Sequence, residues 1–193
     1  MTTITIRLAS AERFADVEHA LTGGGDGASC WCQWFMVRQS EFDAATSDER
    51  RDMLRRDLAT EPLPSALIAY VDDEPAGWVK VSPRPAQPRL ARGRTAKASA
   101  EPSDAPDVWA VTCFAVRREY RSQQLARRLL DAAVDHARAH GARIVEGYPI
   151  DTATKTTTSN DLFHGALSTF TAAGFTETAR TSPHRPIVAL TLA

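Results

Sequence analysis

The sequence predicts an α/β fold built on one mixed β-sheet, in an α+β arrangement. Residues 108–116 are rich in β-branched and aromatic side chains, which is typical of a buried strand. After a short turn, apolar residues recur at helical spacing until Gly141, which favours a helix end. The apolar face of that helix comprises Leu125, Leu129, Leu130, Ala133, Val134 and Ala137.

Before this central unit the sequence predicts one strand and two helices. Residues 4–9 alternate between apolar and polar side chains, as a half-buried strand does. A helix should follow over residues 10–21, with its first serine as the N-cap. A second helix should begin at Ser40 or Ser47 and end at Leu58, because a capping sequence precedes its apolar side.

A hairpin is expected next, because turn residues separate two β-rich runs at residues 66–71 and 77–81. After the central unit we expect a fifth strand, a further helix and a closing pair of strands. These elements cover residues 143–150, 161–173, 175–180 and 186–192. The complete order is then β-α-α-β-β-β-α-β-α-β-β.

Length and charge limit the class of protein. Residues 1–193 are expected to form one domain, because this length supports one substantial core. A net charge of -1 argues against a nucleic-acid partner, since that class needs a basic surface. The sequence starts without a secretory apolar region and has no apolar run of membrane-spanning length. We therefore expect no membrane partner and a cytoplasmic location.

The turn after residue 116 has the spacing of a pyrophosphate-binding loop. Free backbone N–H groups at a helix start, with the positive end of the helix dipole, bind phosphate oxygens. A strand, turn and helix without any ligand is the alternative. The residues expected to bind phosphate are Arg121, Ser122, Gln123, Gln124, Leu125, Ala126 and Arg127.

The segment from Arg121 to Ala126 resembles motif A of the GNAT superfamily of N-acetyltransferases, whose pattern is Gln/Arg-x-x-Gly-x-Gly/Ala. Gln124 stands where the family usually has glycine. If Gln124 keeps a right-handed helical backbone, its N–H group still points at phosphate. Residues 166–175 resemble the family segment Ala-x-x-x-Tyr-x-x-x-Gly-Phe. The element order also matches, so the resemblance covers nearly the whole chain. The chain is similar to an uncharacterised bacterial group of this superfamily. The resemblance implies a GNAT-like acyl-CoA N-acyltransferase fold.

This resemblance implies that an amine attacks the thioester of acetyl-CoA directly. The fourth and fifth strands should splay apart to admit the pantetheine arm of the cofactor. That arm would pair with the backbone of Phe114, Ala115 and Val116, and one N–H group there would polarise the thioester carbonyl. Phe170 stands at the family's tyrosine position. We expect it to contact the cofactor, although phenylalanine cannot protonate the leaving thiolate.

The catalytic residues are harder to assign. Glu146 is the first candidate for the general base, because a carboxylate among the apolar residues of a strand is often tuned for proton transfer. A structural salt bridge is the alternative. Tyr148 shares its strand face and could orient the amine or act as the acid, or simply pack in the core. Asp151, His164 or a chain of water molecules are further candidates for the base.

The acceptor pocket of the resembling fold lies near residues 29–35. Trp31 and Trp34 could line an apolar slot, with Gln33 as a polar anchor. Thr112 stands at a position where some members carry a carboxylate, so we place it at the substrate as well. The alternative is that these aromatic residues only fill the core between the helices.

Residues 82–106 form a proline- and arginine-rich insertion between the third and fourth strands, where the family usually has a shorter connection. A structureless loop of this length inside a domain is uncommon. It is expected either to be solvated and mobile, or to bring its arginines over the cofactor phosphates or an anionic part of the acceptor.

Three cysteines, Cys30, Cys32 and Cys113, are expected to be free thiols. The Cys-x-Cys spacing is not that of a zinc finger and no second pair follows, so no metal is expected. Packing is the favoured role for all three. Cys113 could alternatively carry an acyl group, but its place in the middle of a strand favours packing.

Together these expectations describe an N-acetyltransferase that uses acetyl-CoA to acetylate the amine of a small molecule. A protein acetyltransferase acting on a lysine or an N-terminus is one alternative. A non-catalytic acyl-CoA-binding domain is another, which Phe170, Thr112 and Gln124 keep open. Assembly as a homodimer stays open.

Overall fold

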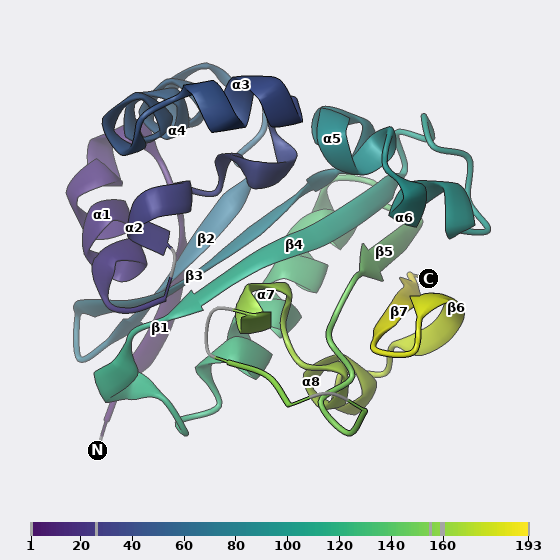
Figure 1. The fold of residues 1–193 in the computed structure, drawn as a ribbon. Helices are drawn as coiled ribbons and strands as arrows, with labels where there is room; N and C mark the ends of the chain where they lie inside the picture. The colour runs from purple at the N-terminus through teal and green to yellow at the C-terminus, as the bar shows by residue number, and fades with distance from the viewer. Residues whose placement is uncertain (1, 26, 155, 159–160, 193) are drawn as a thin grey trace.

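The computed structural model describes residues 2–25, 27–154, 156–158 and 161–192. Within these ranges one seven-stranded sheet has the order β1-β2-β3-β4-β5-β7-β6, which confirms the predicted mixed sheet (Figure 1). Neighbouring strands pair in an antiparallel manner, except for β4 and β5, which are parallel. The strands are β1 (Ile4–Leu8), β2 (Ala66–Val71), β3 (Glu74–Pro83), β4 (Val108–Val116), β5 (Ile144–Gly147), β6 (Thr176–Ser182) and β7 (Arg185–Thr191).

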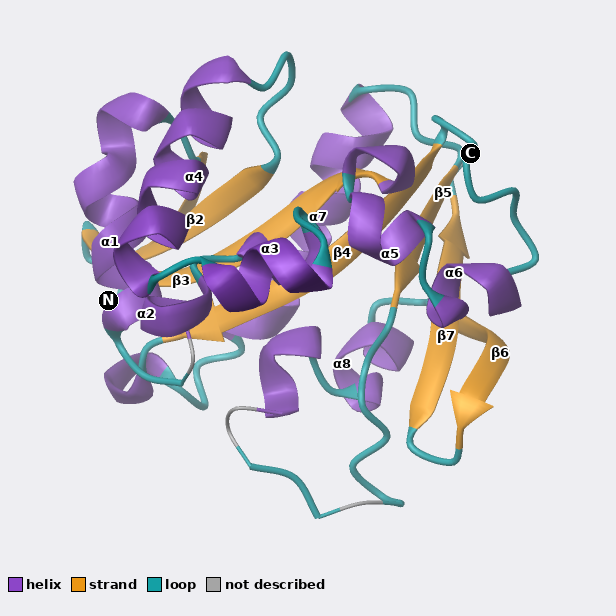
Figure 2. Ribbon diagram, turned by 45° about the horizontal axis from the view of Figure 1, so that its top comes forward, coloured by secondary structure: helices purple, strands orange, loops and turns teal. Residues whose placement is uncertain are grey.

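Helices cover both faces of the sheet. The two helices α7 and α8 lie on one face, and the earlier helices lie over the other (Figures 1 and 2). Within the described residues no helix has both the length and the apolar character needed to cross a membrane. The helices are α1 (Phe14–Thr22), α2 (Gly27–Cys30), α3 (Gln39–Ala44), α4 (Ser47–Thr60), α5 (Pro88–Ala91), α6 (Arg94–Ala98), α7 (Leu125–Ala139) and α8 (Leu167–Ala172).

The structure shows which of the predicted N-terminal helix caps form. Thr46 and Glu49 form the reciprocal capping box expected at the start of α4. The two alternative starts at residues 40 and 47 correspond to two separate helices, α3 and α4. Ser10 makes no capping hydrogen bond with its side chain, and a short 3₁₀ helix, Ala11–Arg13, precedes α1. Ser10 is thus at the predicted N-cap position, but of this 3₁₀ helix and without a capping bond from its side chain.

The strands β4 and β5 pair only over their first four residues. The last parallel pair joins Val111 to Gly147, whereas β4 continues to Val116. The fifth strand is shorter than predicted because the chain leaves the sheet before Pro149, which has no N–H group to donate. The predicted divergence of the fourth and fifth strands is thus confirmed. It leaves one side of the β4 backbone from Thr112 onward without a strand partner among the described residues.

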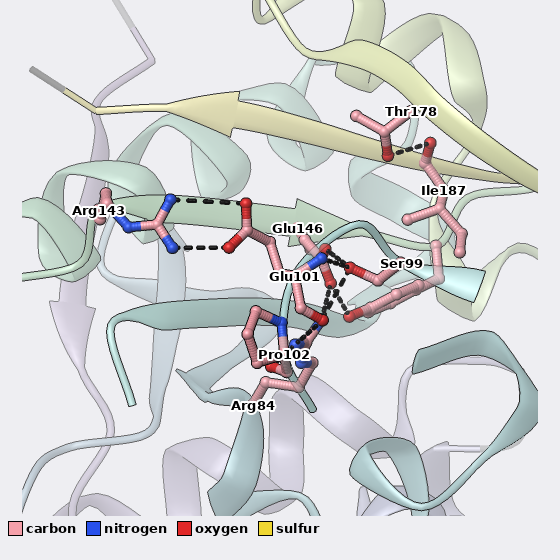
Figure 3. A network of polar contacts seen from close by, with 9 residues as sticks. Arg84, Ser99, Glu101, Pro102, Arg143, Glu146, Thr178 and Ile187 are labelled. Atoms are coloured by element: carbon pink, nitrogen blue, oxygen red, sulfur yellow. Dashed lines mark hydrogen bonds and ion pairs between the residues drawn. The ribbon is translucent and has the colours of Figure 1, made fainter. Parts of the chain in front are cut away.

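The insertion of residues 82–106 is folded, contrary to the expectation of a solvated and mobile loop. It contains the short helices α5 and α6. Its Arg84 side chain is completely buried and points inward to the carboxylate of Glu146 on β5, with Nη1 and Oε2 2.7 Å apart (Figure 3). Ser99 also bonds Glu146, and the Arg84 guanidinium reaches the carbonyl oxygens of Glu101 and Pro102. These bonds fasten the insertion to the sheet.

We predict that Arg84→Met lowers the free energy of unfolding by about 3–5 kcal/mol, because it leaves the buried Glu146 carboxylate without its charged partner. Denaturant unfolding of the full chain measures this loss. Arg92→Met, at an exposed arginine of the same insertion, is the control and should stay within about 0.5 kcal/mol of the original protein. An Arg84 variant no less stable than the Arg92 variant would contradict the importance of the pair.

Candidate active site

A cavity of about 700 Å³ opens where β4 and β5 diverge. It runs from the turn before α7, along the unpaired half of β4, to a group of aromatic side chains beside α2 and α3. One cavity therefore joins a possible phosphate-binding turn, a free strand edge and an apolar end. Its lining includes Leu21, Cys30, Cys32, Trp34, Phe42, Cys113, Phe114, Ala115, Val116, Arg121, Ala126, Leu162, Phe163, Gly165, Ala166 and Thr169.

The turn before α7 holds two residues with a left-handed backbone. Gln124 has φ 59° and ψ 20°, and Ser122 has φ 67°. The condition of a right-handed backbone at Gln124 is therefore not met, because Gln124 is the N-cap, where the chain turns sharply into the helix. Left-handed geometry is also the reason a glycine suits this position. Such turns point successive N–H groups into one concave surface, which favours an anion.

Residues 125–127 complete this surface. The first backbone bond of α7 runs from the Arg128 N–H to the Gln124 carbonyl, so the preceding N–H groups have no acceptor within the helix. Arg121 and Ala126 line the cavity directly. Leu125 is buried in the core, and Arg127 pairs with Asp131 at 2.8 Å. In this turn, phosphate binding would therefore rely on the backbone of residues 122–127 more than on their side chains.

Phe170 was expected at the cofactor but lies outside the cavity lining, as do the side chains of Ser122, Gln123, Gln124, Leu125 and Arg127 in the turn. The Phe170 ring is fully buried and packs edge-on against Phe114 and Phe175, with ring centroids 5.9 and 5.1 Å apart. It fills the space beside Gly147, where an added Cβ would lie 2.2 Å from the ring. Phe170 is thus a packing residue where the strands diverge, and Thr169 of α8 reaches the cavity instead.

The structure separates the residues expected at the acceptor. Trp34 lines the cavity, but Trp31, Gln33 and Thr112 do not. The indole N–H of Trp31 donates to Ser47 Oγ at 3.0 Å, and the Gln33 amide donates to Asp57 at 2.9 Å. These two bonds attach the segment to α4.

Thr112 is buried in β4, opposite an irregularity in the pairing with β3 that falls between Lys80 and Val81. Its Oγ1 atom has no hydrogen-bond partner within the described residues. It therefore lies in the strand core, away from the position at the substrate that we expected.

An arginine of the insertion does approach the aromatic end of the cavity. The Arg89 guanidinium stacks over the Trp34 ring, 3.5 Å from its centroid, and also bonds Gln39. Phe42 also packs edge-on against the Trp34 ring, with ring centroids 5.1 Å apart. The insertion therefore supports the position of Trp34 with a cation–π contact.

The expected catalytic pair lies outside the cavity. Glu146 is occupied by Arg84 and Ser99, and the Tyr148 hydroxyl donates to Glu146 at 2.7 Å. Neither side chain belongs to the cavity lining. The alternative of a structural salt bridge therefore describes Glu146. No sequence pattern pointed to its partner, which lies 62 residues away in the insertion. The structure gives no support to Glu146 as the base.

The further candidates for the base are also constrained. Asp151 pairs with Arg180 at 2.9 Å. His164 is buried against the ring of Phe163, and this burial lowers its pKa to about 3, so the imidazole is neutral at neutral pH and a weak base. Among the described residues that line the cavity, the titratable side chains are those of Arg121 and the three cysteines.

Two neighbouring glutamines provide a test of the turn. Gln124→Gly should raise the free energy of unfolding by about 0.5–1 kcal/mol. A residue with a side chain costs about 1–2 kcal/mol in the left-handed backbone region, and glycine avoids this cost. Gln123→Gly should lower the free energy of unfolding by about 0.5–1 kcal/mol. The backbone of Gln123 is not in the left-handed region, so glycine there only increases the chain entropy of the unfolded state. Denaturant unfolding measures both, and equal destabilisation by the two substitutions would contradict the turn geometry.

Solved structures of the same fold include known acetyltransferases. YncA, a putative acetyltransferase from Salmonella typhimurium with its cofactor acetyl-CoA, is 14% identical with a TM-score of 0.57, covering 98% of this chain and 94% of that one. The PaiA N-acetyltransferase from Thermoplasma acidophilum in complex with coenzyme A is 14% identical with a TM-score of 0.54, covering 98% and 99%. The Escherichia coli ribosomal-protein-S18-alanine N-acetyltransferase is 12% identical with a TM-score of 0.53, covering 99% and 95%.

These similarities show the fold. No curated protein sequence matches the chain significantly. The model of the acetyltransferase (GNAT) family matches residues 31–163, which is more than half of the chain and includes β4, the turn before α7 and part of the cavity lining. The chain therefore belongs to the GNAT acetyltransferase family.

Proposed function

We propose that the protein transfers an acetyl group from acetyl-CoA to the amine of a small molecule. One observation carries this proposal: a single cavity joins the turn before α7, the unpaired edge of β4 and an apolar end that contains Trp34. These are the three features needed to hold a pyrophosphate, an extended amide chain and an acceptor.

The cofactor would extend along β4. Its pyrophosphate would accept hydrogen bonds from the N–H groups of residues 123–127, and its amides would pair with Phe114 and Val116. The thioester would then lie near Cys113, where β4 has separated from β5. Two structures of the same fold hold coenzyme A or acetyl-CoA, which supports this choice of co-substrate.

The backbone of β4 would also contribute to the reaction. An N–H group of the unpaired segment, aimed at the thioester carbonyl, would stabilise the negative charge that develops on oxygen during acyl transfer. Such a donor belongs to a rigid strand and needs no reorganisation when charge develops. The coenzyme thiolate would then leave.

The far end of the cavity favours an apolar or aromatic amine. Leu21, Trp34, Phe42 and Phe163 supply apolar walls there. No carboxylate appears among the described lining residues, so an acceptor with further positive charges would find no partner in them. We therefore infer that the acceptor is small, largely apolar and carries its reactive amine in neutral form.

A screen of amines with acetyl-CoA, read out by release of free thiol, tests this proposal. Apolar and aromatic amines should be turned over. Trp34→Ala should raise the KM of the acceptor about tenfold or more, since it removes roughly 1.5–3 kcal/mol of apolar contact, and should leave the KM of acetyl-CoA unchanged.

Trp109→Phe is the control, because Trp109 is also a buried tryptophan but lies outside the cavity lining. It should leave both KM values unchanged. If coenzyme A binds but no amine accelerates thiol release, the alternative of a non-catalytic acyl-CoA-binding domain replaces our proposal.

A further inference from the structure

A second pocket lies beside the aromatic end of the cavity, between α3 and α5. Its volume is about 320 Å³, and its lining consists of Arg38, Gln39, Pro88, Arg89 and Arg92. The two short helices lie side by side, and the Arg89 side chain bonds Gln39, which is 50 residues earlier in the sequence (Figures 1 and 2). The pocket thus brings together arginines from two separate segments of the chain.

The helix α5 presents two of these arginines from a fixed position. Arg89 and Arg92 are three residues apart, so their side chains leave the same side of the helical turn. The core holds the rest of this segment. Leu90 is buried, and the buried side-chain amide of Gln87 donates to the Ala110 carbonyl of β4 at 3.2 Å. One wall of the pocket is therefore anchored to the sheet.

The Arg89 guanidinium is partly removed from water without gaining a negatively charged partner. It stacks over Trp34, and its Nη2 donates to the neutral side-chain oxygen of Gln39. Its Nη1 is buried and has no hydrogen-bond partner within the described residues. Burial lowers the pKa of Arg89, although the nearby Asp43 carboxylate opposes this shift. A negative charge in the pocket would stabilise this guanidinium.

The pocket carries an excess of positive charge. Arg38 and Arg92 are exposed, and neither forms an ion pair within the part of the chain that the structure describes. Asp43 is the carboxylate that acts on Arg89, and the Gln39 amide already donates to its two oxygens at 2.8 and 2.7 Å. The unneutralised charge of the arginines therefore favours an anion.

The number of arginines and the size of the pocket indicate which anion. A carboxylate offers one charge and two oxygens, whereas a phosphate group carries about -1.5 to -2 at pH 7 and offers three strong acceptor oxygens. Guanidinium groups suit such oxyanions because each presents a planar fork of donors. A pocket of about 320 Å³ is at the lower end of the range for small-molecule sites. A small phosphate fits these properties.

We propose that Arg38, Arg89 and Arg92 form a binding site for a phosphate group, either as the free ion or as part of a small organic molecule. The site goes beyond the proposed function and does not rest on it. It is also separate from the turn before α7, because the two cavities share no lining residue among those described.

Arg89 connects this site to the aromatic wall of the main cavity. The same guanidinium lines the phosphate pocket and lies 3.5 Å from the centroid of the Trp34 ring. A phosphate paired with Arg89 changes the charge felt by the indole, so binding should alter the fluorescence of Trp34. If phosphate changes the affinity of the main cavity for a ligand, that ligand must change the affinity for phosphate by the same factor.

A titration of the full chain with inorganic phosphate tests this site. Excess coenzyme A is present, so that the turn before α7 is occupied, and tryptophan fluorescence and the NMR signals of the arginine Nε–H groups are followed. We expect saturable binding that shifts the Arg89 signal. Arg38→Met and Arg92→Met should each raise the phosphate Kd by about tenfold, the scale of one charge-assisted hydrogen bond.

Two control variants identify the pocket. Arg94→Met removes an exposed arginine of the same insertion that does not line the pocket, and it should change the Kd by no more than about twofold, because salt screens distant charges. Trp34→Phe should abolish the fluorescence change, while the arginine NMR signals still report binding. Thermal unfolding verifies that each variant is folded.

The outcomes are distinct. If phosphate does not bind, or binds equally well to the Arg38 and Arg92 variants, the proposed site is refuted. Equal weakening by Arg94→Met indicates general charge attraction and refutes it as well. Phenyl phosphate separates the two sources of the ligand. Tighter binding of phenyl phosphate than of inorganic phosphate identifies a phosphate carried by an organic molecule, whereas equal affinity identifies the free ion.

Discussion

The short parallel pairing of β4 and β5 is the constraint on which the site depends. The pairing ends at Val111 and Gly147, and from there the two strands diverge. The Phe170 ring occupies the space beside Gly147, so a side chain at that position would not fit. This divergence exposes the β4 backbone to the cavity, whose lining includes Phe114, Ala115 and Val116.

A second constraint fixes the other side of the cavity. The buried Arg84 and Glu146 pair ties the insertion to β5, and α5 of the same insertion presents Arg89 to the face of Trp34. A charged pair at this depth is costly to desolvate, and removal of one partner is more damaging than replacement of both. The insertion thus has a structural connection to the sheet at one point and to the aromatic wall of the cavity at another.

The sequence was sufficient for the features that depend on local patterns. Strand alternation, helical periodicity and the capping box near Thr46 predicted most elements, and the spacing after Val116 located the turn before α7. It was not sufficient where contacts between residues distant in the sequence determine the position of a side chain. Glu146 resembled a buried base because its partner Arg84 is distant in the sequence. Trp31 and Gln33 bond to α4 instead of lining the cavity, and the left-handed backbone at Trp31 was not evident from the sequence.

The central claim is that coenzyme A binds along the unpaired edge of β4 and the turn before α7. Amide hydrogen exchange with and without coenzyme A tests it most directly. We expect slower exchange at Phe114, Val116 and residues 123–127, because these N–H groups would bond the ligand, and no change in the β6–β7 hairpin. Protection elsewhere, with the β4 and turn amides unaffected by saturating coenzyme A, would contradict this account.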